Sequence, residues 1–194
     1  MKRTKTDRPA PDRPAPPPPE QPPTLSGRAV QIVEAARELI EAGGTDALTM
    51  RSLADRLGIR APSLYKHFPD KAAVEAQVIG LAMADLAEML ESARPVGDLL
   101  SLGAAYREYA LTHPHLYRLM SNGPLPRHLL PAGVEERAAM PLVRAVGFDE
   151  HLSRAVWAFA HGMVILELDG RFPPDAELTG AWQAGLSAFT HTTP

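Results

Sequence analysis

The sequence predicts an all-α protein of about nine helices. From residue 25 onwards, apolar side chains recur every three to four residues, which is the period of a helix with one buried side. Glycine and proline clusters break this pattern at short intervals, and neither a strand-like alternation nor an internal repeat is evident. The chain has 194 residues, 45% of them hydrophobic, so it has room for one large domain or two small ones with a real core.

Residues 1–24 are expected to form a tail without a core. They contain nine of the twenty prolines, and Met1 is their only apolar side chain larger than alanine. Such a segment buries too little apolar surface to fold, so we expect it to be disordered or locally polyproline II. Its five basic residues leave two interpretations open: a solubilising tail, or an arm that adds contacts to phosphate groups.

Caps and helix breakers divide the rest of the chain. Thr49 and Asp149 can each accept a backbone N–H at a helix start, Pro62 suits a first helical turn, and glycine favours a helix end. The predicted helices are, in order, about 29–42, 49–58, a third of about seven residues from 62, 70–94, 99–113, 115–122, 135–146, 149–168 and 175–190. Pro141 should kink or split the seventh, because proline removes a backbone hydrogen bond and clashes with the preceding turn.

Residues 48–71 have the organisation of a helix-turn-helix, with a short helix, a sharp turn and a second short helix. Gly58 stands where a left-handed C-cap is wanted, because it lacks a Cβ. The expected buried face comprises Leu53, Leu57, Ile59, Leu64 and Phe68, and the opposite face carries Arg51, Arg60, Ser63, Lys66 and His67. Such polar groups on a rigidly held helix can read base edges in the major groove. The spacing alone is equally compatible with two core helices joined by a tight corner.

The order of residues in this stretch is more specific than its spacing. It reads LTMR at 48–51, LA at 53–54, LGI at 57–59, PSLYKHF at 62–68 and a lysine at 71. With the alanine-rich helix before it, this part of the chain (27–75) resembles the N-terminal signature of TetR-family transcriptional regulators. The resemblance implies a helix-turn-helix DNA-binding domain at 25–71 and a helical effector-binding and dimerisation domain at 72–194. It also implies a homodimer on a near-palindromic operator in double-stranded DNA.

The same resemblance implies which residues contact DNA. They are Thr49, Arg51, Arg60, Ala61, Pro62, Ser63, Tyr65, Lys66, His67 and Lys71. Arg51 corresponds to an arginine that reaches a base in some members of the family and phosphate in others. Residues 61–63 correspond to the early recognition-helix positions that meet base edges.

Other positions in this set correspond to contacts with the DNA backbone. Tyr65 and His67 match residues on the sugar-phosphate backbone, although either ring could instead pack within the protein. Lys66 can reach phosphate or a base, and Lys71 matches a lysine that clamps phosphate at the start of the fourth helix. Arg60 departs from the family, which often has serine or threonine here, so we expect a weaker cap and an additional cation facing DNA.

The last two helices carry small residues at which another helix can approach closely. The faces concerned comprise Ala155, Ala158, Phe159, Gly162 and Ile165 in the first of these helices, with Ala181, Ala184, Gly185 and Ala188 in the second. Such faces also suit packing within one chain, and the family resemblance favours a four-helix dimer interface. A second resemblance covers residues 100–172, through YALTHPHLYRLM at 109–120 and WAFAHG at 157–162. They look like the C-terminal effector domain named for its Trp, His and Gly.

A ligand cavity is expected among the fourth to eighth helices. Its candidate residues are large or adaptable, and several carry one polar group: Met83, Leu86, Tyr106, Tyr109, Tyr117, Met120, Trp157 and His161. Side chains of these types at helical spacing are also typical of a core, and His161 could be a hydrogen-bonded core histidine. His113 and His115 lack a third metal ligand at suitable spacing, so no metal site is expected.

Composition and charge exclude several classes of protein. The chain has no cysteine, which excludes disulfides and thiolate sites, and no catalytic or phosphate-loop motif is evident. The longest apolar stretch, Ala155–Leu168, is too short and too polar to span a membrane. Net charge is +2 for residues 1–24, +1 for 25–71 and −6 for 72–194, so a polyanion should meet the N-terminal third.

These observations predict a cytoplasmic bacterial transcription regulator that binds a specific DNA sequence. We expect a repressor that an unidentified small-molecule effector releases from its operator, with no cofactor and no membrane partner. One alternative is an interaction module with a degenerate DNA-binding head, against which Arg51, Lys66 and Lys71 argue. The other is a helical enzyme, against which the lack of catalytic motifs argues.

Overall fold

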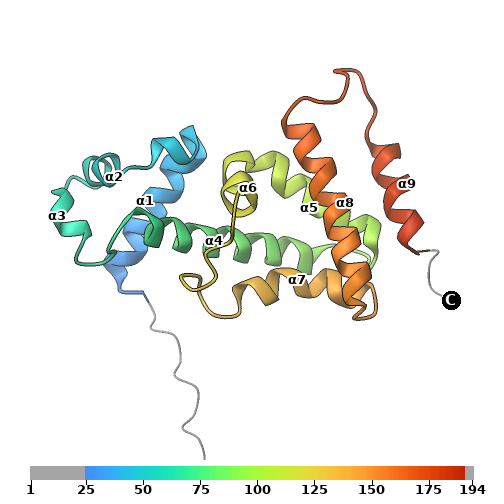
Figure 1. Cartoon of the computed structure of the whole chain (residues 1–194), viewed down its shortest axis with the longest axis horizontal. Coiled ribbons are helices and arrows are strands. Elements are labelled where there is room, and N and C mark those ends of the chain that lie inside the picture. The colour runs from blue at the N-terminus through green and yellow to red at the C-terminus, as the bar shows by residue number, and fades with distance from the viewer. Residues whose placement is uncertain (1–24, 191–194) are drawn as a thin grey trace, which may run out of the picture.

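The computed structural model describes residues 25–190, and the predicted tail at 1–24 lies outside them. These residues form nine α-helices and one 3-10 turn without a strand, which confirms the all-α prediction. The elements are α1 (Gly27–Gly43), η1 (Thr45–Ala47), α2 (Met50–Arg56), α3 (Ala61–Leu64), α4 (Lys71–Ser92), α5 (Leu99–Thr112), α6 (Pro114–Ser121), α7 (Val134–Ala145), α8 (Glu150–Leu168) and α9 (Thr179–Thr190). Helices α1–α3 form one end, α4 runs from there along the molecule, and α8 and α9 lie side by side at the far end (Figure 1).

Side-chain caps begin most of the longer helices. Ser26, Thr49, Asp70, Asp98 and Asp149 each accept a hydrogen bond from the backbone N–H three residues ahead, at 2.8 to 3.2 Å. Each bond satisfies one N–H group that the start of a helix leaves without a partner. The caps predicted at Thr49 and Asp149 are confirmed.

The third helix is shorter than predicted. It ends at Leu64, whose carbonyl accepts the N–H groups of both His67 (2.9 Å) and Phe68 (3.0 Å). The bond from His67 spans only three residues, so the chain tightens into a turn after Leu64. Pro69 follows directly and cannot continue a helix.

The last helix begins later than predicted, at Thr179 instead of Asp175. The carboxylate of Glu177 accepts the N–H groups of Thr179 (2.8 Å) and Gly180 (3.0 Å). These two bonds satisfy donors at the helix start, which explains why the helix begins after Glu177.

Pro141 lies inside α7, which continues from Val134 to Ala145, so of the two predicted effects the helix is not split. Proline lacks only its own N–H, and the remaining helical bonds and the packing of α7 along α4 hold the segment together. The loop before α7 also lies close to α4. A Cβ at Gly80 would come within 2.7 Å of the ring of Pro131, so only glycine leaves room for this approach.

The buried side chains form two clusters that α4 and α6 share. The first comprises apolar residues of α1, α2, α3 and the first half of α4, together with Leu116 of α6. The second comprises residues of the second half of α4, α5, α8 and α9, together with Tyr117 of α6. We call the part of the molecule around the first cluster the head and the part around the second the body.

Two glycines allow α9 to pack closely on the body. A Cβ at Gly103 would lie 2.3 Å from Leu186, and a Cβ at Gly185 would lie 2.1 Å from the ring of Phe159. Phe159 also packs edge-on against Trp182 and Phe189, with ring centroids 5.8 and 5.9 Å apart. Its ring therefore has little freedom to move aside.

None of the helices within residues 25–190 combines the length and the apolar character that crossing a membrane requires.

Replacing Gly185 with alanine should lower stability. The added methyl group would overlap the ring of Phe159, so we expect a loss of about 1–3 kcal/mol in the free energy of unfolding despite the higher helix propensity of alanine. Urea unfolding followed by circular dichroism measures this change. Gly27→Ala is the matched control, because a Cβ there meets no atom within 4 Å. An unchanged or raised midpoint for Gly185→Ala would contradict the packing described.

Candidate functional site

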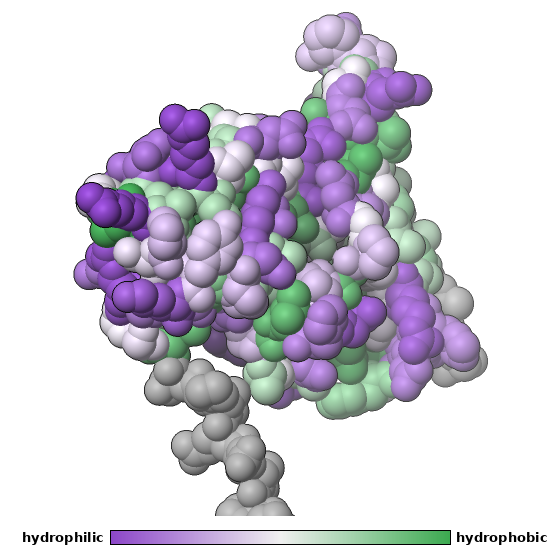
Figure 2. All heavy atoms as spheres, turned by 60° about the vertical axis from the view of Figure 1, so that its left-hand side comes forward, coloured by the Kyte–Doolittle hydropathy of each residue, from purple (hydrophilic) through white to green (hydrophobic). Residues whose placement is uncertain are grey.

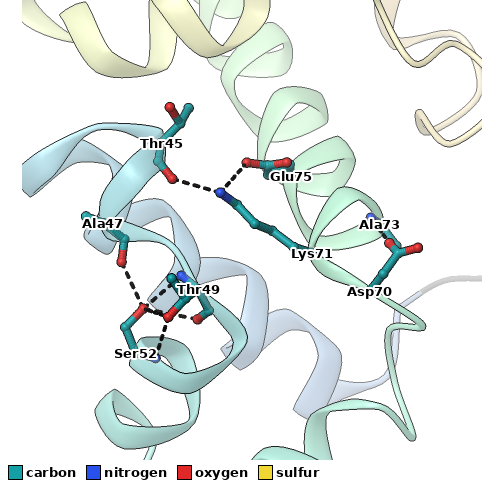
Figure 3. Close-up of polar contacts among 8 residues, drawn as sticks. All are labelled: Thr45, Ala47, Thr49, Ser52, Asp70, Lys71, Ala73 and Glu75. Atoms are coloured by element: carbon teal, nitrogen blue, oxygen red, sulfur yellow. Dashed lines mark hydrogen bonds and ion pairs between the residues drawn. The ribbon is translucent and has the colours of Figure 1, made fainter.

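A reciprocal capping box sets the start of α2. Thr49 Oγ1 accepts the N–H of Ser52 at 2.9 Å, and Ser52 Oγ accepts the N–H of Thr49 at 2.9 Å (Figure 3). Ser52 Oγ also donates to the carbonyl oxygen of Ala47 at 2.8 Å, which ties α2 to the η1 turn. The hydroxyl of Thr49, predicted to contact DNA, is thus engaged in the cap.

The turn between α2 and α3 has the predicted geometry. Gly58 adopts the left-handed conformation with φ 63°, and the Ile59 N–H bonds to the carbonyl of Ala54 at 3.0 Å. Arg60 is the N-cap of α3 and makes no side-chain cap bond, as its departure from the family predicts. Its side chain is exposed instead.

The two short helices bury one face and expose the other. Leu53, Leu64 and Phe68 are buried in the head cluster, as predicted. Six of the predicted DNA-contacting residues are exposed along the opposite side: Arg51, Arg60, Pro62, Tyr65, Lys66 and His67. Tyr65 is 53% exposed, so neither it nor His67 is a packed aromatic. Hydrophilic side chains cover most of this end of the molecule in Figure 2.

The basic side chains on this surface differ from the other basic side chains of residues 25–71 in whether they have a partner within the described chain. Of the seven basic residues between 25 and 71, Arg37, Arg56 and Lys71 form ion pairs with acidic residues. Arg28 bonds to Gln31. The other three are Arg51, Arg60 and Lys66, whose side chains contact no acidic or hydrogen-bonding partner among the described residues. Although the head has only a slight excess of positive charge, its three basic residues without any side-chain partner within residues 25–190 lie on or next to α2 and α3.

Lys71 differs from the other predicted DNA contacts. Its Nζ donates to the carbonyl oxygen of Thr45 at 3.0 Å and lies 3.3 Å from Glu75 Oε1 (Figure 3). It joins the start of α4 to the η1 turn, next to the cap of α2. Its charge is partly neutralised within the chain, so a contact with phosphate would compete with Glu75.

A cavity of about 820 Å³ lies in the body between α4, α5, α6, α7 and α8. Seven of the eight predicted ligand-binding residues line it: Met83, Leu86, Tyr106, Tyr117, Met120, Trp157 and His161. Tyr109 does not, because its ring is buried elsewhere and its hydroxyl donates to the carbonyl oxygen of Ala82 at 2.9 Å. The prediction that Tyr109 lines the ligand cavity is therefore corrected: its side chain lies outside the lining.

A chain of hydrogen bonds crosses the cavity wall. The hydroxyls of Tyr106 and Tyr117 lie 2.9 Å apart, and the Tyr117 hydroxyl lies 2.7 Å from His161 Nδ1. Burial lowers the pKa of His161, so its imidazole is neutral at neutral pH. Burial also raises the pKa of both tyrosines, which keeps them protonated. His161 is thus both hydrogen-bonded and on the cavity wall.

Sequence reasoning did not anticipate the charged rim of this cavity. Arg127 pairs with Glu135 at 2.7 Å, and Arg154 pairs with Glu150 at 2.9 Å. The second pair has i,i+4 spacing on α8, which the sequence alone could have suggested. The first pair joins a loop to α7, and only the folded structure reveals it.

His113 has a side-chain partner within the chain. Its Nδ1 lies 2.9 Å from Glu41, and within residues 25–190 no cluster of His, Asp or Glu is suited to a metal ion.

The last two helices have an inward-facing and an exposed set of residues. On α8 and α9, Phe159 packs against Gly185 inside the chain. Ala155, Ala158, Ala181 and Ala184 are exposed and leave a surface of small side chains.

Two family patterns match this chain. The pattern described as bacterial regulatory proteins, tetR family, matches residues 32–78, which span α2, α3 and parts of α1 and α4. The pattern described as tetracyclin repressor-like, C-terminal domain, matches residues 99–189, from α5 to α9.

Curated relatives are regulators of the same kind. An uncharacterised HTH-type transcriptional regulator of Mycobacterium tuberculosis is 29% identical over 151 residues, which are 72% of this chain and 69% of that protein. The HTH-type transcriptional repressor BdcR of Escherichia coli is 37% identical over 86 residues, 41% of this chain and 44% of the relative. The class A tetracycline repressor protein from transposon 1721 of E. coli is 42% identical over 67 residues, 34% and 30% of the two chains. The alignments with the last two thus cover less than half of either protein.

Solved structures share the fold. A tetR-family transcriptional regulator from Streptomyces coelicolor has a TM-score of 0.65 at 21% identity, covering 84% of this chain and 80% of that one. A TetR variant from Acinetobacter baumannii in complex with minocycline has a TM-score of 0.60 at 23% identity, covering 87% and 96%. Matches to both halves, regulators as relatives and the observed helix-turn-helix agree: this chain belongs to the TetR family of helix-turn-helix transcriptional regulators.

Proposed function

We propose that this protein is a ligand-responsive, sequence-specific repressor that binds a near-palindromic DNA operator as a homodimer and leaves it when a small molecule binds. The observation that carries the proposal is the gathering of unpaired Arg51, Arg60 and Lys66 on the exposed face of α2 and α3. A polyanion such as DNA would complement this surface on a chain whose net charge is −3. A DNA-binding protein of this kind works in the bacterial cytoplasm.

We propose separate roles on DNA for the residues of this surface other than Arg60. Arg51 reaches a base or a nearby phosphate, and residues 61–63 meet base edges from the start of α3. Tyr65, His67 and Lys66 contact the sugar-phosphate backbone at the other end of the short helix. Their lack of partners within the described residues supports these roles, because no internal bond has to break before DNA binds.

The proposed operator is nearly palindromic, so it has two half-sites that a dimer would bind. Two heads must enter successive major grooves, about 34 Å or a multiple of it apart. We assign the DNA-binding domain to residues 25–71 and the effector and dimerisation domain to 72–194. The exposed small side chains of α8 and α9 would pack against the same helices of a second copy.

The body cavity is the proposed effector site. The TetR variant of A. baumannii was solved with minocycline bound, which supports a small-molecule site in a protein of this fold. We also propose that the body is of the Trp-His-Gly kind. Trp157 and His161 both line the cavity, and their ring centroids lie 6.0 Å apart in a tilted arrangement, which supports a shared role.

Helix α6 is the proposed route from the cavity to the head. Leu116 is fully buried in the head cluster, whereas the next residue, Tyr117, lies on the cavity wall. A ligand that displaces Tyr117 would therefore also move a side chain in the head core. If the ligand stabilises one distance between the two heads of the dimer, the affinity for DNA changes by the coupling free energy between the ligand site and the DNA site.

Selection of bound sequences from random double-stranded DNA tests the proposal. The full chain should enrich a near-palindromic motif whose half-sites are about 10 base pairs or a multiple apart. A variant with Arg51, Arg60 and Lys66 changed to alanine is the control and should enrich nothing. If the unaltered chain also enriches no motif, the alternative of a degenerate head is favoured.

Arg51→Ala should weaken binding to the selected operator. If Arg51 reads a base, we expect a loss of about 1–3 kcal/mol on the operator and little loss on random DNA. Fluorescence anisotropy with both DNAs measures the difference. Arg171→Ala removes an exposed arginine in the loop between α8 and α9 and is the charge-matched control. Equal losses on both DNAs would identify a phosphate contact instead.

Glu75→Gln should strengthen DNA binding by freeing Lys71. Without the carboxylate 3.3 Å away, the ammonium group can reach phosphate, so the salt dependence of log K should steepen by up to about 0.9. Glu136→Gln, in an exposed position on α7, controls for the change in net charge. The double variant Lys71→Gln, Glu75→Gln should show neither the stronger DNA binding nor the steeper salt dependence. A slope unchanged by Glu75→Gln would contradict a phosphate contact by Lys71.

A further inference from the structure

We propose that the body cavity takes an uncharged, mainly apolar ring compound with one hydrogen-bonding hydroxyl or carbonyl group. This inference rests on the proposed role of the cavity as the effector site and states which chemical class the effector belongs to. Three features of the cavity carry it: an apolar lining, charges confined to paired groups at the rim, and a neutral hydrogen-bond chain in the wall.

The lining offers a large apolar surface. Leucines from three helices, Leu86, Leu90, Leu102 and Leu142, contribute to it together with Met83 and Met120. Met83 and Met120 are unbranched and polarisable, so they adapt to a ring of varied outline. Burying an apolar surface against such a lining is the main source of affinity for a small ligand.

The charged residues of the lining cancel one another. Arg127 pairs with Glu135, and Arg154 pairs with Glu150, at 2.7 and 2.9 Å. Both arginines keep about two thirds of their side-chain surface exposed, so these pairs lie at the rim and not in the interior. A charged ligand would lose its hydration in the cavity and find no unpaired counter-charge there, which disfavours it.

The aromatic side of the cavity supplies hydrogen bonds without charge. Tyr117 lies in the middle of the chain, between the hydroxyl of Tyr106 and His161 Nδ1. If the Tyr117 hydroxyl donates to His161, Nε2 carries the proton and is a donor; if His161 donates instead, the Tyr106 hydroxyl becomes the free donor and Nε2 an acceptor. The chain can therefore meet either a hydroxyl or a carbonyl by reversing its direction, and neither state is charged.

The same side chains favour a flat ring. Tyr106 meets Tyr117 edge-on, Tyr117 stacks on His161 with centroids 5.9 Å apart, and Trp157 follows at 6.0 Å from His161. Aromatic walls of this kind pack well against planar unsaturated rings in offset or edge-on geometry. Trp157 is 54% exposed in the single chain, so part of its ring remains available.

Three probes of one shape test the inference: biphenyl, 4-phenylphenol and biphenyl-4-carboxylate. Isothermal titration calorimetry with the full chain at pH 7 should rank 4-phenylphenol first, with biphenyl roughly three- to tenfold weaker because it lacks one hydrogen bond. The carboxylate should bind more weakly still. Tightest binding by the carboxylate, equal binding by phenol and hydrocarbon, or no binding by any of the three would each overturn the proposal.

Variants at the two ends of the hydrogen-bond chain locate the contact. Tyr106→Phe and His161→Phe should leave the affinity for biphenyl within about twofold, and at least one should abolish the advantage of 4-phenylphenol. Leu111→Ala, on an exposed part of α5, is the control and should change nothing. If the advantage of the phenol survives both variants, the hydrogen-bond chain does not recognise the ligand and the proposal fails.

The two proposals fail in different ways. If the probes bind in the expected order but DNA affinity is unaffected, the ligand class stands and the effector role of the cavity fails. If the chain binds its operator while the carboxylate outcompetes the neutral probes, the ligand class fails and the regulator stands.

Discussion

The head depends on burial of helices that are too short to be stable alone. Helix α2 has seven residues and α3 has four, and isolated helices of this length do not persist in water. They persist here because Leu53 and Leu64 are fully buried against α1 and α4, and because Thr49 and Ser52 cap the start of α2. Every exposed side chain proposed to contact DNA takes its position from this packing.

The same packing links the head to the body. Helix α4 contributes buried residues to both clusters, and α6 contributes Leu116 to one and Tyr117 to the other. An ion pair and a hydrogen bond add to the link: Arg37 of α1 pairs with Asp85 of α4, and Glu41 of α1 lies 2.9 Å from His113 Nδ1 before α6. Because close-packed interiors deform in discrete steps, a displacement at the cavity wall has a direct mechanical route to the head.

Electrostatics are organised locally in both functional regions. In the head, acidic partners neutralise Arg37, Arg56 and Lys71, whereas Arg51, Arg60 and Lys66 stay unpaired within the described residues on or next to α2 and α3, where DNA would bind. In the cavity, the charges pair at the rim and the interior stays neutral. Net charge, which is −3 for the chain, reveals neither arrangement.

The sequence by itself determined the fold class and the order of the helices, because these follow from apolar periodicity and from capping and helix-breaking residues. The helix-turn-helix needed more than spacing, and the resemblance of residues 27–75 to the TetR family identified it. The sequence also indicated the lack of a side-chain cap at Arg60. It misjudged the start of α9, since the hydrogen bonds that the Glu177 carboxylate accepts decide that point, and it left open whether Pro141 kinks or splits α7, which the structure shows is not split.

Only the tertiary structure decided which of the polar and aromatic residues have partners. Lys71 is joined to Thr45 and Glu75, Tyr109 lies outside the cavity, and Leu116 belongs to the head core. Most of these contacts join segments far apart in the chain, and no local pattern encodes them. A periodic pattern shows that a side chain faces inward, whereas the folded chain determines which neighbour it meets there.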